Sequence, residues 1–410
     1  MLVMTRTTRV AGFTLIEFMI AITLSLVVLA ALTATFVANS RTRTEIERAN
    51  DQIESGRFSL STLSSDVELA GFLGQFNVNN AKSLAAPGAK PSPCLSDVAA
   101  LNANLLIHLQ GYDGDAPSAQ ISPAIPTTCI SDVKAGTDVL AIRRAATCIG
   151  GTANCAMVTN APYFQASLCS GGGELGSLVH SDWFRLDTNL ANLNRTQRNC
   201  ATAAVRRQFL TNIYFVANND VAGDGIPTLK RAELGGDANG DGTADVNAGG
   251  RLFAITPVAH GIENMQIEYG IDTTASPGDG APDVFTASPD IYNRTTPASP
   301  FANCSANNSL TLGCVQNWRD VMAIKVTLLA RNTDVTKNQP VASNPCNWSG
   351  AKTGYYCDTK VYSLGLKADG TVKCAWDPDA DGTCDPFLDA YKRHVYSTMV
   401  RLSNPAGRRE

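Results

Sequence analysis

Apolar and polar residues divide the chain into three parts. The first twelve residues are short and basic, with Arg6 and Arg9 and no acid, and residues 13–38 are almost entirely apolar. At about 1.5 Å per residue this run forms a helix of about 39 Å, longer than a hydrocarbon core of about 30 Å. A secretory signal peptide has a shorter apolar region, so the pattern predicts a helix that spans a membrane.

Beyond Ala38 the polarity changes, but the helical period continues. Ile46, Ile53, Leu60 and Val67 recur every seven residues, beside a second row formed by Ala49, Gly56, Leu63 and Ala70. This spacing predicts that the same helix continues through residues 39–70 and ends near Gly71. We expect its apolar stripe to pack on the remainder of the chain.

After Gly71 the pattern changes to short apolar segments separated by Pro, Gly, Asn and Asp. Such segments, alternating or rich in β-branched and aromatic residues, indicate antiparallel strands. The expected strands are Val139–Ile142, Phe209–Val216, Ile262–Tyr269, Val321–Leu329 and His394–Leu402, with surface loops near Ala85–Pro93, Ser276–Ala281 and Thr295–Ser309. The predicted fold class is α+β: a long N-terminal helix packed on an antiparallel sheet that loop insertions enlarge.

Composition supports a folded chain and excludes one class of partner. Hydrophobic residues make up 44% of the sequence and charged residues 17%, which is enough apolar material for a substantial core. The net charge of -4 and the dispersed Arg and Lys argue against a nucleic-acid binder, which needs clustered basic residues. We therefore expect no nucleic-acid partner.

Twelve cysteines, all beyond residue 90, indicate an oxidising compartment, and none forms a C-x-x-C pair typical of zinc or redox sites. Short intervals favour pairing between neighbours. The disulfide candidates are Cys148 with Cys155, Cys304 with Cys314, Cys346 with Cys357, and Cys374 with Cys384. The basic leader stays in the cytoplasm under the positive-inside rule, which places the cysteines outside it.

The apolar run contains a single acid, Glu17, whose carboxylate needs a partner or an interfacial position in a bilayer. Gly12, Phe13, Thr14, Leu15, Ile16 and Glu17, after a short basic leader, resemble the class III signal of type IV prepilins. The resemblance implies that a prepilin peptidase cleaves between Gly12 and Phe13 and methylates the new amine of Phe13. It also implies that Glu17 meets the N-terminal amine of a neighbouring subunit, so that two charges satisfy each other in hydrocarbon.

Later segments resemble the PilW family of minor pilins. They are the strand end Phe215–Asn218, the segments 223–229 (GDGIPTL) and 261–270 (GIENMQIEYG), and the terminal residues 401–404. The resemblance implies a type IV pilin-like fold with a leader (1–12), a transmembrane half-helix (13–38), an amphipathic half-helix (39–70) and a β-rich head (71–410). It implies a structural protein without catalytic residues that helps to prime pilus assembly and lies in the pilus tip complex.

The same resemblance implies partners and a location. The expected partners are other minor pilins, the major pilin, a large tip adhesin, the inner-membrane assembly platform and the prepilin peptidase. Before assembly the protein would be a single-pass inner-membrane protein with a periplasmic head, and after assembly it would reach the pilus and the cell surface. Twitching motility, cell adhesion and DNA uptake are all compatible processes.

Two acidic loops have the alternating oxygen side chains and the Gly at position six that calcium-binding loops need. The candidate ligands are Asp237, Asn239, Asp241, Thr243 and Asp245 in the first loop, and Asp377, Asp379, Asp381, Thr383 and Asp385 in the second. Both loops lack Glu at position twelve, where Ala248 and Leu388 stand. Calcium is therefore one reading, and solvated acidic turns are the other.

Three other functions remain open. A minor pseudopilin of a type II secretion system would share the leader and the helix. A membrane-anchored periplasmic hydrolase would need a catalytic motif, but the sequence has only four histidines and neither H-E-x-x-H nor G-x-S-x-G. A head that binds a host surface or DNA could use the basic residues Arg195, Arg198, Arg206 and Arg207.

The dispersed Trp183, Trp318, Trp348 and Trp376 are expected to be packing or interface residues.

Overall fold

The computed structural model of the chain describes residue 12 and ranges 14–76, 90–114, 129–169, 183–247, 250–274, 278–290, 292, 312–336, 357–367, 370–379 and 381–407. Phe13, most of the leader and most of the expected surface loops lie outside these ranges. The chain forms two units, residues 1–51 and residues 52–410, which are described separately.

The first unit holds the N-terminal part of helix α1 (Leu15–Glu68). Its side chains are exposed from Leu15 to Thr44, including Ile16, Phe18 and Leu32, each of which is more than half exposed. By length and composition, α1 is the helix among the described residues that could cross a membrane. The apolar run that we expected to span a membrane therefore lies in the N-terminal part of α1.

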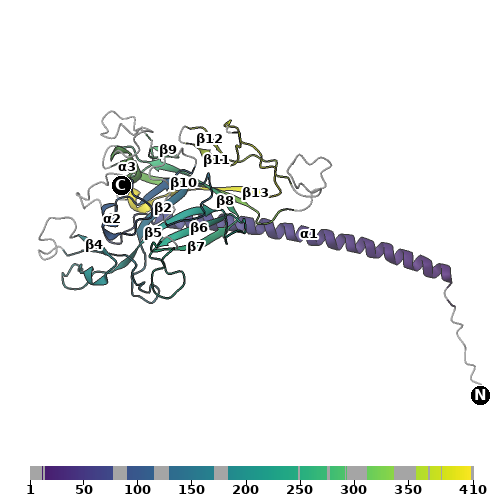
Figure 1. Cartoon of the computed structure of the whole chain (residues 1–410), viewed down its shortest axis with the longest axis horizontal. Coiled ribbons are helices and arrows are strands. Elements are labelled where there is room, and N and C mark those ends of the chain that lie inside the picture. The colour runs from purple at the N-terminus through teal and green to yellow at the C-terminus, as the bar shows by residue number, and fades with distance from the viewer. Residues whose placement is uncertain are drawn as a thin grey trace, which may run out of the picture. The chain divides into compact units, whose positions relative to one another are not determined.

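The second unit is built on a seven-stranded antiparallel sheet (Figure 1). Its main path has the order β1-β2-β5-β3-β4, and β6 joins β5 to β7. The strands are β1 (Leu109–Tyr112), β2 (Val139–Ala145), β3 (Tyr163–Ala166), β4 (Phe184–Asp187), β5 (Arg207–Ala217), β6 (Thr228–Leu234) and β7 (Phe253–His260). β5 is central and is buried along most of its length.

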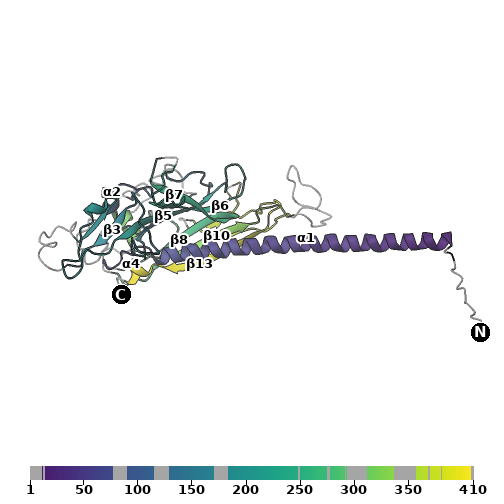
Figure 2. The same ribbon diagram turned by 90° about the horizontal axis from the view of Figure 1, so that it is seen from below.

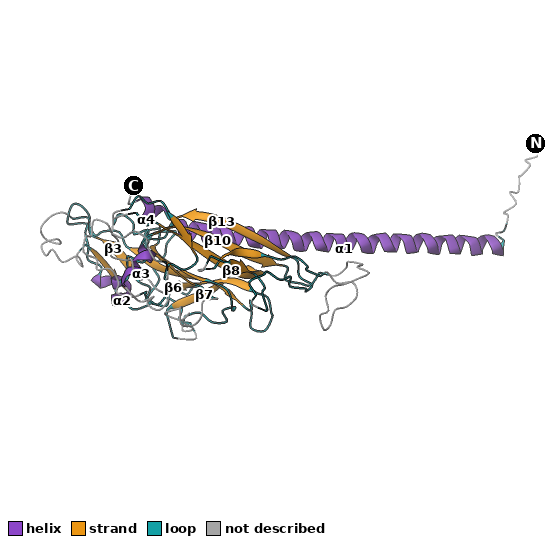
Figure 3. Cartoon of the chain, turned by 90° about the horizontal axis from the view of Figure 1, so that it is seen from above, coloured by secondary structure: helices purple, strands orange, loops and turns teal. Residues whose placement is uncertain are grey.

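A four-stranded antiparallel sheet has the order β13-β10-β8-β9, and its strands β10 and β13 run beside the C-terminal turns of α1 (Figures 2 and 3). The strands are β8 (Ile262–Ile271), β9 (Val284–Thr286), β10 (Val321–Arg331) and β13 (Arg393–Arg401). A separate hairpin pairs β11 (Ser363–Leu366) with β12 (Val372–Cys374). Short helices complete the unit: α2 (Val98–Ala103), η3 (Leu190–Asn192), α3 (Leu312–Arg319) and α4 (Ser403–Gly407).

The two largest apolar clusters among the described residues hold this unit together. One joins Leu63 and Val67 of α1 to both sheets, through residues such as Ile142, Tyr214 and Ile324. The other covers a different set of side chains on β2 and β5 and includes the clustered rings of Phe76, Phe164 and Phe184. Because burying apolar area is the main driving force for folding, the helix end is an integral part of the head.

The five strands expected from the sequence are all present, each within two residues of its expected bounds except β2, which continues to Ala145 instead of ending at Ile142. The short strands β1, β3, β4, β9, β11 and β12 were not expected, because three or four residues carry too little alternation to be distinguished from a loop. Strands β6 and β7 were also missed. Their patterns contain charged or proline residues, such as Lys230 and Pro257, that weaken a strand signal.

Each of the disulfides between described residues joins one cysteine to the next cysteine along the chain. Cys148–Cys155 and Cys374–Cys384 occur as the short intervals suggest. Two wider loops are closed in the same way, by Cys94–Cys129 and Cys169–Cys200. Cys357 is also disulfide-bonded, whereas Cys304, Cys346 and the side chain of Cys314 lie outside the described residues. The bridges fasten the loops around the sheets.

Candidate functional site

The first turn of α1 contains a reciprocal hydrogen-bond pair between Thr14 and Glu17. The Glu17 carboxylate accepts from the backbone N–H of Thr14 at 2.9 Å and from its hydroxyl at 3.0 Å. In return the Glu17 N–H donates to Thr14 Oγ1 at 3.3 Å. This is a capping box, in which two otherwise unpaired N–H groups at a helix start are satisfied by each other's side chains.

The cap gives Glu17 a partner in the isolated chain and fixes where the helix begins. An acid in the first turn is also favoured by the positive end of the helix dipole. At the residue before the predicted cleavage point, Gly12, no described residue would lie within 4 Å of an added Cβ. Phe13 lies outside the described residues. No described side chain therefore covers the Gly12 side of the predicted processing point.

In the second unit, the end of α1 is held against β13 at a glycine. The ring of Tyr396 lies so close to Gly56 that a Cβ there would overlap it. Four residues earlier, Gln52 Nε2 donates to the carbonyls of Ala330 at 2.8 Å and Lys392 at 2.9 Å. Gly56 costs helix propensity but permits a close helix–sheet approach that a larger residue would prevent.

A buried polar cluster ties the C-terminal end of α1 to strands β2 and β5 of the seven-stranded sheet. Asp66, 5% exposed, accepts from Arg144 Nε at 2.6 Å, Asn212 Nδ2 at 2.6 Å and the Tyr214 hydroxyl at 3.0 Å. At the helix end, Asn404 Nδ2 donates to the carbonyls of Glu68 and Ala70. Asn404 thus satisfies carbonyls that a helix terminus leaves unpaired.

Two large apolar side chains of these turns are exposed. Ile53 is 46% exposed and Phe58 is 54% exposed, while Ser59 and Leu63 on the inner face are fully buried. The heptad row of the sequence is consequently divided: Val67 enters the core, but Ile53 does not. An exposed Ile and Phe on a helix are the side chains expected of a contact surface for another chain.

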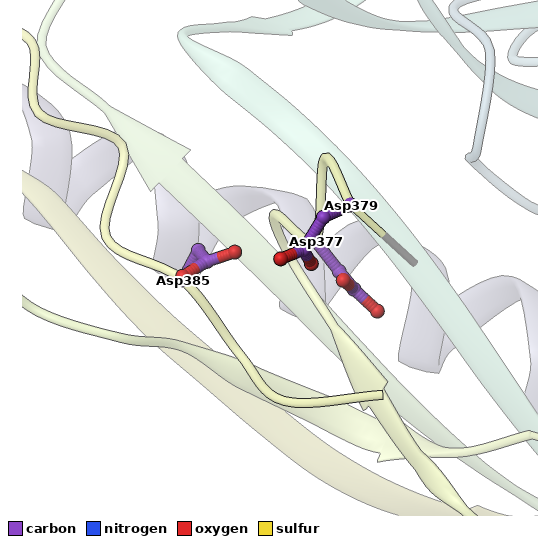
Figure 4. A group of neighbouring side chains, drawn as sticks. All are labelled: Asp377, Asp379 and Asp385. Carbon is purple, nitrogen blue, oxygen red and sulfur yellow. The ribbon is translucent and has the colours of Figure 1, made fainter. Parts of the chain in front are cut away.

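The second acidic loop gathers three of its predicted ligands (Figure 4). Asp377, Asp379 and Asp385 each present a carboxylate oxygen, and these atoms all lie within 4.8 Å of one another. Partial desolvation raises the pKa of Asp385, and the carboxylates of Asp379, Asp381 and Asp377 raise it further. Asp377 Oδ1 is buried without a hydrogen-bond partner among the described residues. Grouped carboxylates of this kind suit a hard cation.

Members of this loop also bond their own turn: the N–H of Gly382 donates to Asp377 Oδ2 at 3.2 Å. Asp381 Oδ1 accepts from the N–H of Thr383 at 2.7 Å, and Gly382 has a positive φ of 84°. Cys374 and Cys384 close the loop with a disulfide. The turn is therefore held in shape by the chain itself.

The first acidic loop is arranged differently. Asp237 accepts from the N–H groups of Gly240, Asp241 and Gly242, and Asp245 accepts from Ala238 and Asn239. Thr243 N–H donates to Asp241 Oδ1. Within residues 237–247, all described, the carboxylates do not form a trio at metal-binding distances. Their oxygens are directed into the backbone of their own turn.

Besides the cluster around Asp66, sequence reasoning missed two further buried charge clusters. Lys90 Nζ lies 2.5 Å from Asp290 Oδ2 between the rings of Tyr112 and Trp318. Arg393, whose side chain is 1% exposed, pairs with Glu263, Asp358 and Asp389. The partners are up to 200 residues apart in sequence for Lys90 and 130 for Arg393, so no local spacing could have indicated them.

The chain matches two protein families. Residues 213–404 match the family described as type IV pilus-assembly protein W (PilW), and residues 7–33 match the prokaryotic N-terminal methylation motif. No curated protein and no solved structure matches the chain. The first match begins in β5 and ends in α4, so it includes both strands that flank the C-terminal turns of α1.

Proposed function

We propose that this chain, a PilW-family type IV minor pilin with a membrane anchor, primes pilus assembly and lies in the pilus tip complex. The observation that carries the proposal is the Thr14–Glu17 cap at the start of a long apolar helix, two residues after Gly12. The role is structural. The proposed location is the inner membrane with a periplasmic head before assembly, and the pilus and cell surface afterwards.

Cleavage after Gly12 changes what Glu17 can bind. The new ammonium at Phe13 would lie one residue before Thr14, whose N–H and hydroxyl already occupy the Glu17 carboxylate. A neighbouring subunit's ammonium is a stronger partner than these neutral donors, because charge-assisted bonds are roughly twice as strong. We infer that Glu17 exchanges its internal cap for an intersubunit ion pair as the helix enters a filament.

Two exposed apolar side chains of α1 provide further contacts. Ile53 and Phe58 in the head unit face outward, while Gly56 and Leu63 are turned inward. We propose that these two side chains pack against other minor pilins or the major pilin. The large tip adhesin and the assembly platform are further proposed partners.

Calcium is proposed for the loop of Asp377, Asp379 and Asp385. The grouped oxygens and the buried oxygen of Asp377 support it. For residues 237–245 the turn-forming hydrogen bonds are a sufficient explanation of the acidic pattern. A cation in the second loop would stiffen the segment that leads from β12 towards β13.

Variants at Glu17 test the proposal in cells. Glu17→Gln retains an amide oxygen that can cap Thr14 but removes the charge, whereas Thr14→Ala removes the hydroxyl and keeps the charge. We expect Glu17→Gln to abolish piliation while the protein still accumulates in the membrane, and Thr14→Ala to have a smaller effect. Normal piliation with Glu17→Gln would contradict the charge-pair role.

The pseudopilin alternative is tested by deleting the gene. Loss of surface pili and twitching with normal exoprotein release is the expected result. Loss of exoprotein release with normal pili would instead indicate a type II secretion system.

A further inference from the structure

A cavity of about 630 Å³ lies beside the hairpin β11–β12, and neither processing nor filament packing uses it. Its lining combines an aromatic wall with charged side chains of both signs. The wall includes Trp376 and Phe387, whose rings stack with centroids 5.8 Å apart and planes inclined by 24°. Trp376 is 45% exposed, so one large aromatic surface is open to solvent.

The interior of the cavity is shaped by Arg393. Its guanidinium lies 3.6 Å from the centre of the Phe387 ring and donates to Glu263 at 2.6 Å and to Asp389 at 2.6 Å. These bonds hold two carboxylates in fixed positions at the cavity wall. The carboxylate oxygens of Glu263 and Asp389 are therefore held in place and do not rotate as those of exposed side chains do.

Two lysines supply donors. Lys134 and Lys367 both line the cavity, and neither ammonium makes a hydrogen bond or ion pair with a described residue. Burial lowers the pKa of Lys134; the nearby Glu263 opposes this, and Arg331 and Arg393 lower it further. A partly buried ammonium without a partner is unfavourable, so a ligand that accepts hydrogen bonds there would be stabilised.

The combination selects a class of ligand. A carboxylate ligand would meet Glu263, Asp389 and Asp377 at the wall, and a cationic ligand would meet the two lysines. Hydroxyl groups both donate and accept, which suits a lining that offers carboxylates and ammonium groups together. The apolar face of a sugar ring also fits an exposed indole.

We propose that this cavity binds an uncharged saccharide, with a sugar ring on Trp376 and hydroxyl groups bonded to Lys134, Lys367 and the carboxylates that Arg393 holds. The proposal goes beyond the assembly role, because saccharide binding does not depend on filament formation. It gives the head a recognition surface of its own. The isolated tryptophan of the sequence thus belongs to a binding wall that only the fold assembles.

The test uses the full mature chain, residues 13–410, in a detergent without a sugar head group and with a chelator present. Tetrasaccharides of glucose, galactose, mannose and N-acetylglucosamine are titrated one at a time, and saturation-transfer NMR reports contact. We expect at least one to bind and to quench tryptophan fluorescence. If none binds, the proposal is wrong.

Variants then locate the binding. Trp376→Ala and Lys134→Gln should each weaken the affinity by about tenfold or more, equivalent to about 1.4 kcal/mol. Lys360→Gln, at an exposed lysine outside the lining, is the matched control and should bind normally. Trp376→Phe keeps an aromatic ring on Phe387 and checks that the loop still folds. Unchanged affinity in both Trp376→Ala and Lys134→Gln would overturn the assignment.

Discussion

Gly56 of helix α1 lies directly beneath the ring of Tyr396 on strand β13, with no room for a methyl group between them. The ring is also held on another side by His394, in an edge contact of 4.6 Å between ring centroids. The helix approaches the sheet closely at this point because residue 56 has no side chain. Several consequences of this docking can be measured.

Gly56→Ala should destabilise the head although alanine is the better helix former. The propensity gain is about 1 kcal/mol, whereas overpacking a well-filled contact typically costs about 1–3 kcal/mol. We expect a lower thermal midpoint for Gly56→Ala and recovery in the double variant Gly56→Ala/Tyr396→Val. Ser61→Ala on the exposed side of α1 is the control. A stabilised Gly56→Ala protein would show that the Tyr396 ring moves away from residue 56 at little energetic cost.

Asp66→Ala should have a larger effect. The substitution leaves Arg144, Asn212 and Tyr214 without their shared acceptor, and Arg144 is only 15% exposed. Breaking a buried pair from one side typically costs about 3–5 kcal/mol. Chemical denaturation should show this loss, while Glu54→Ala, on an exposed position of the same helix, should change little. Similar losses in both variants would contradict a specific role for Asp66.

The sequence predicted the long helix and the strongest strands, because those depend on local periodicity. It did not predict the clusters around Asp66, Lys90 and Arg393, whose partners come together only through the fold. It indicated both acidic loops from the same spacing, yet only residues 377–385 gather carboxylates closely. Spacing specifies which oxygens are available, whereas the backbone decides whether the carboxylates also converge.

Asp138 should make stability depend on pH. Burial, and then the nearby Asp113, raise the pKa of its carboxyl from 3.8 to about 8. Between these values the folded chain holds a proton that the unfolded chain has released, so this contribution to stability is present below about pH 4 and is lost as pH rises through about 8. Denaturation at several pH values should show this decline.

Asp138→Asn stays uncharged and should flatten that decline. It can still accept the bond that Ile267 N–H donates at 2.8 Å. Asp279→Asn, in an exposed turn, serves as the control and should keep the wild-type slope. An unchanged slope in Asp138→Asn would mean that other groups cause the pH dependence.

Terbium luminescence tests the cation proposal, because Tb³⁺ takes the oxygen ligands of Ca²⁺ and Trp376 precedes Asp377 in the sequence. Excitation of the indole should produce terbium emission that excess calcium removes. Asp379→Asn should abolish the emission, and Asp241→Asn in the other acidic loop should leave it intact. Since carboxylates must be ionised to bind, the emission should fall with decreasing pH.

The most direct test of the central claim is the intact mass and N-terminal sequence of the protein from membranes of cells with and without prepilin peptidase. The account predicts a mature chain that begins at methylated Phe13 when the peptidase is present, and an uncleaved chain that begins at Met1 when it is absent. A chain that retains Met1 in the presence of the peptidase would contradict the assignment as a processed pilin.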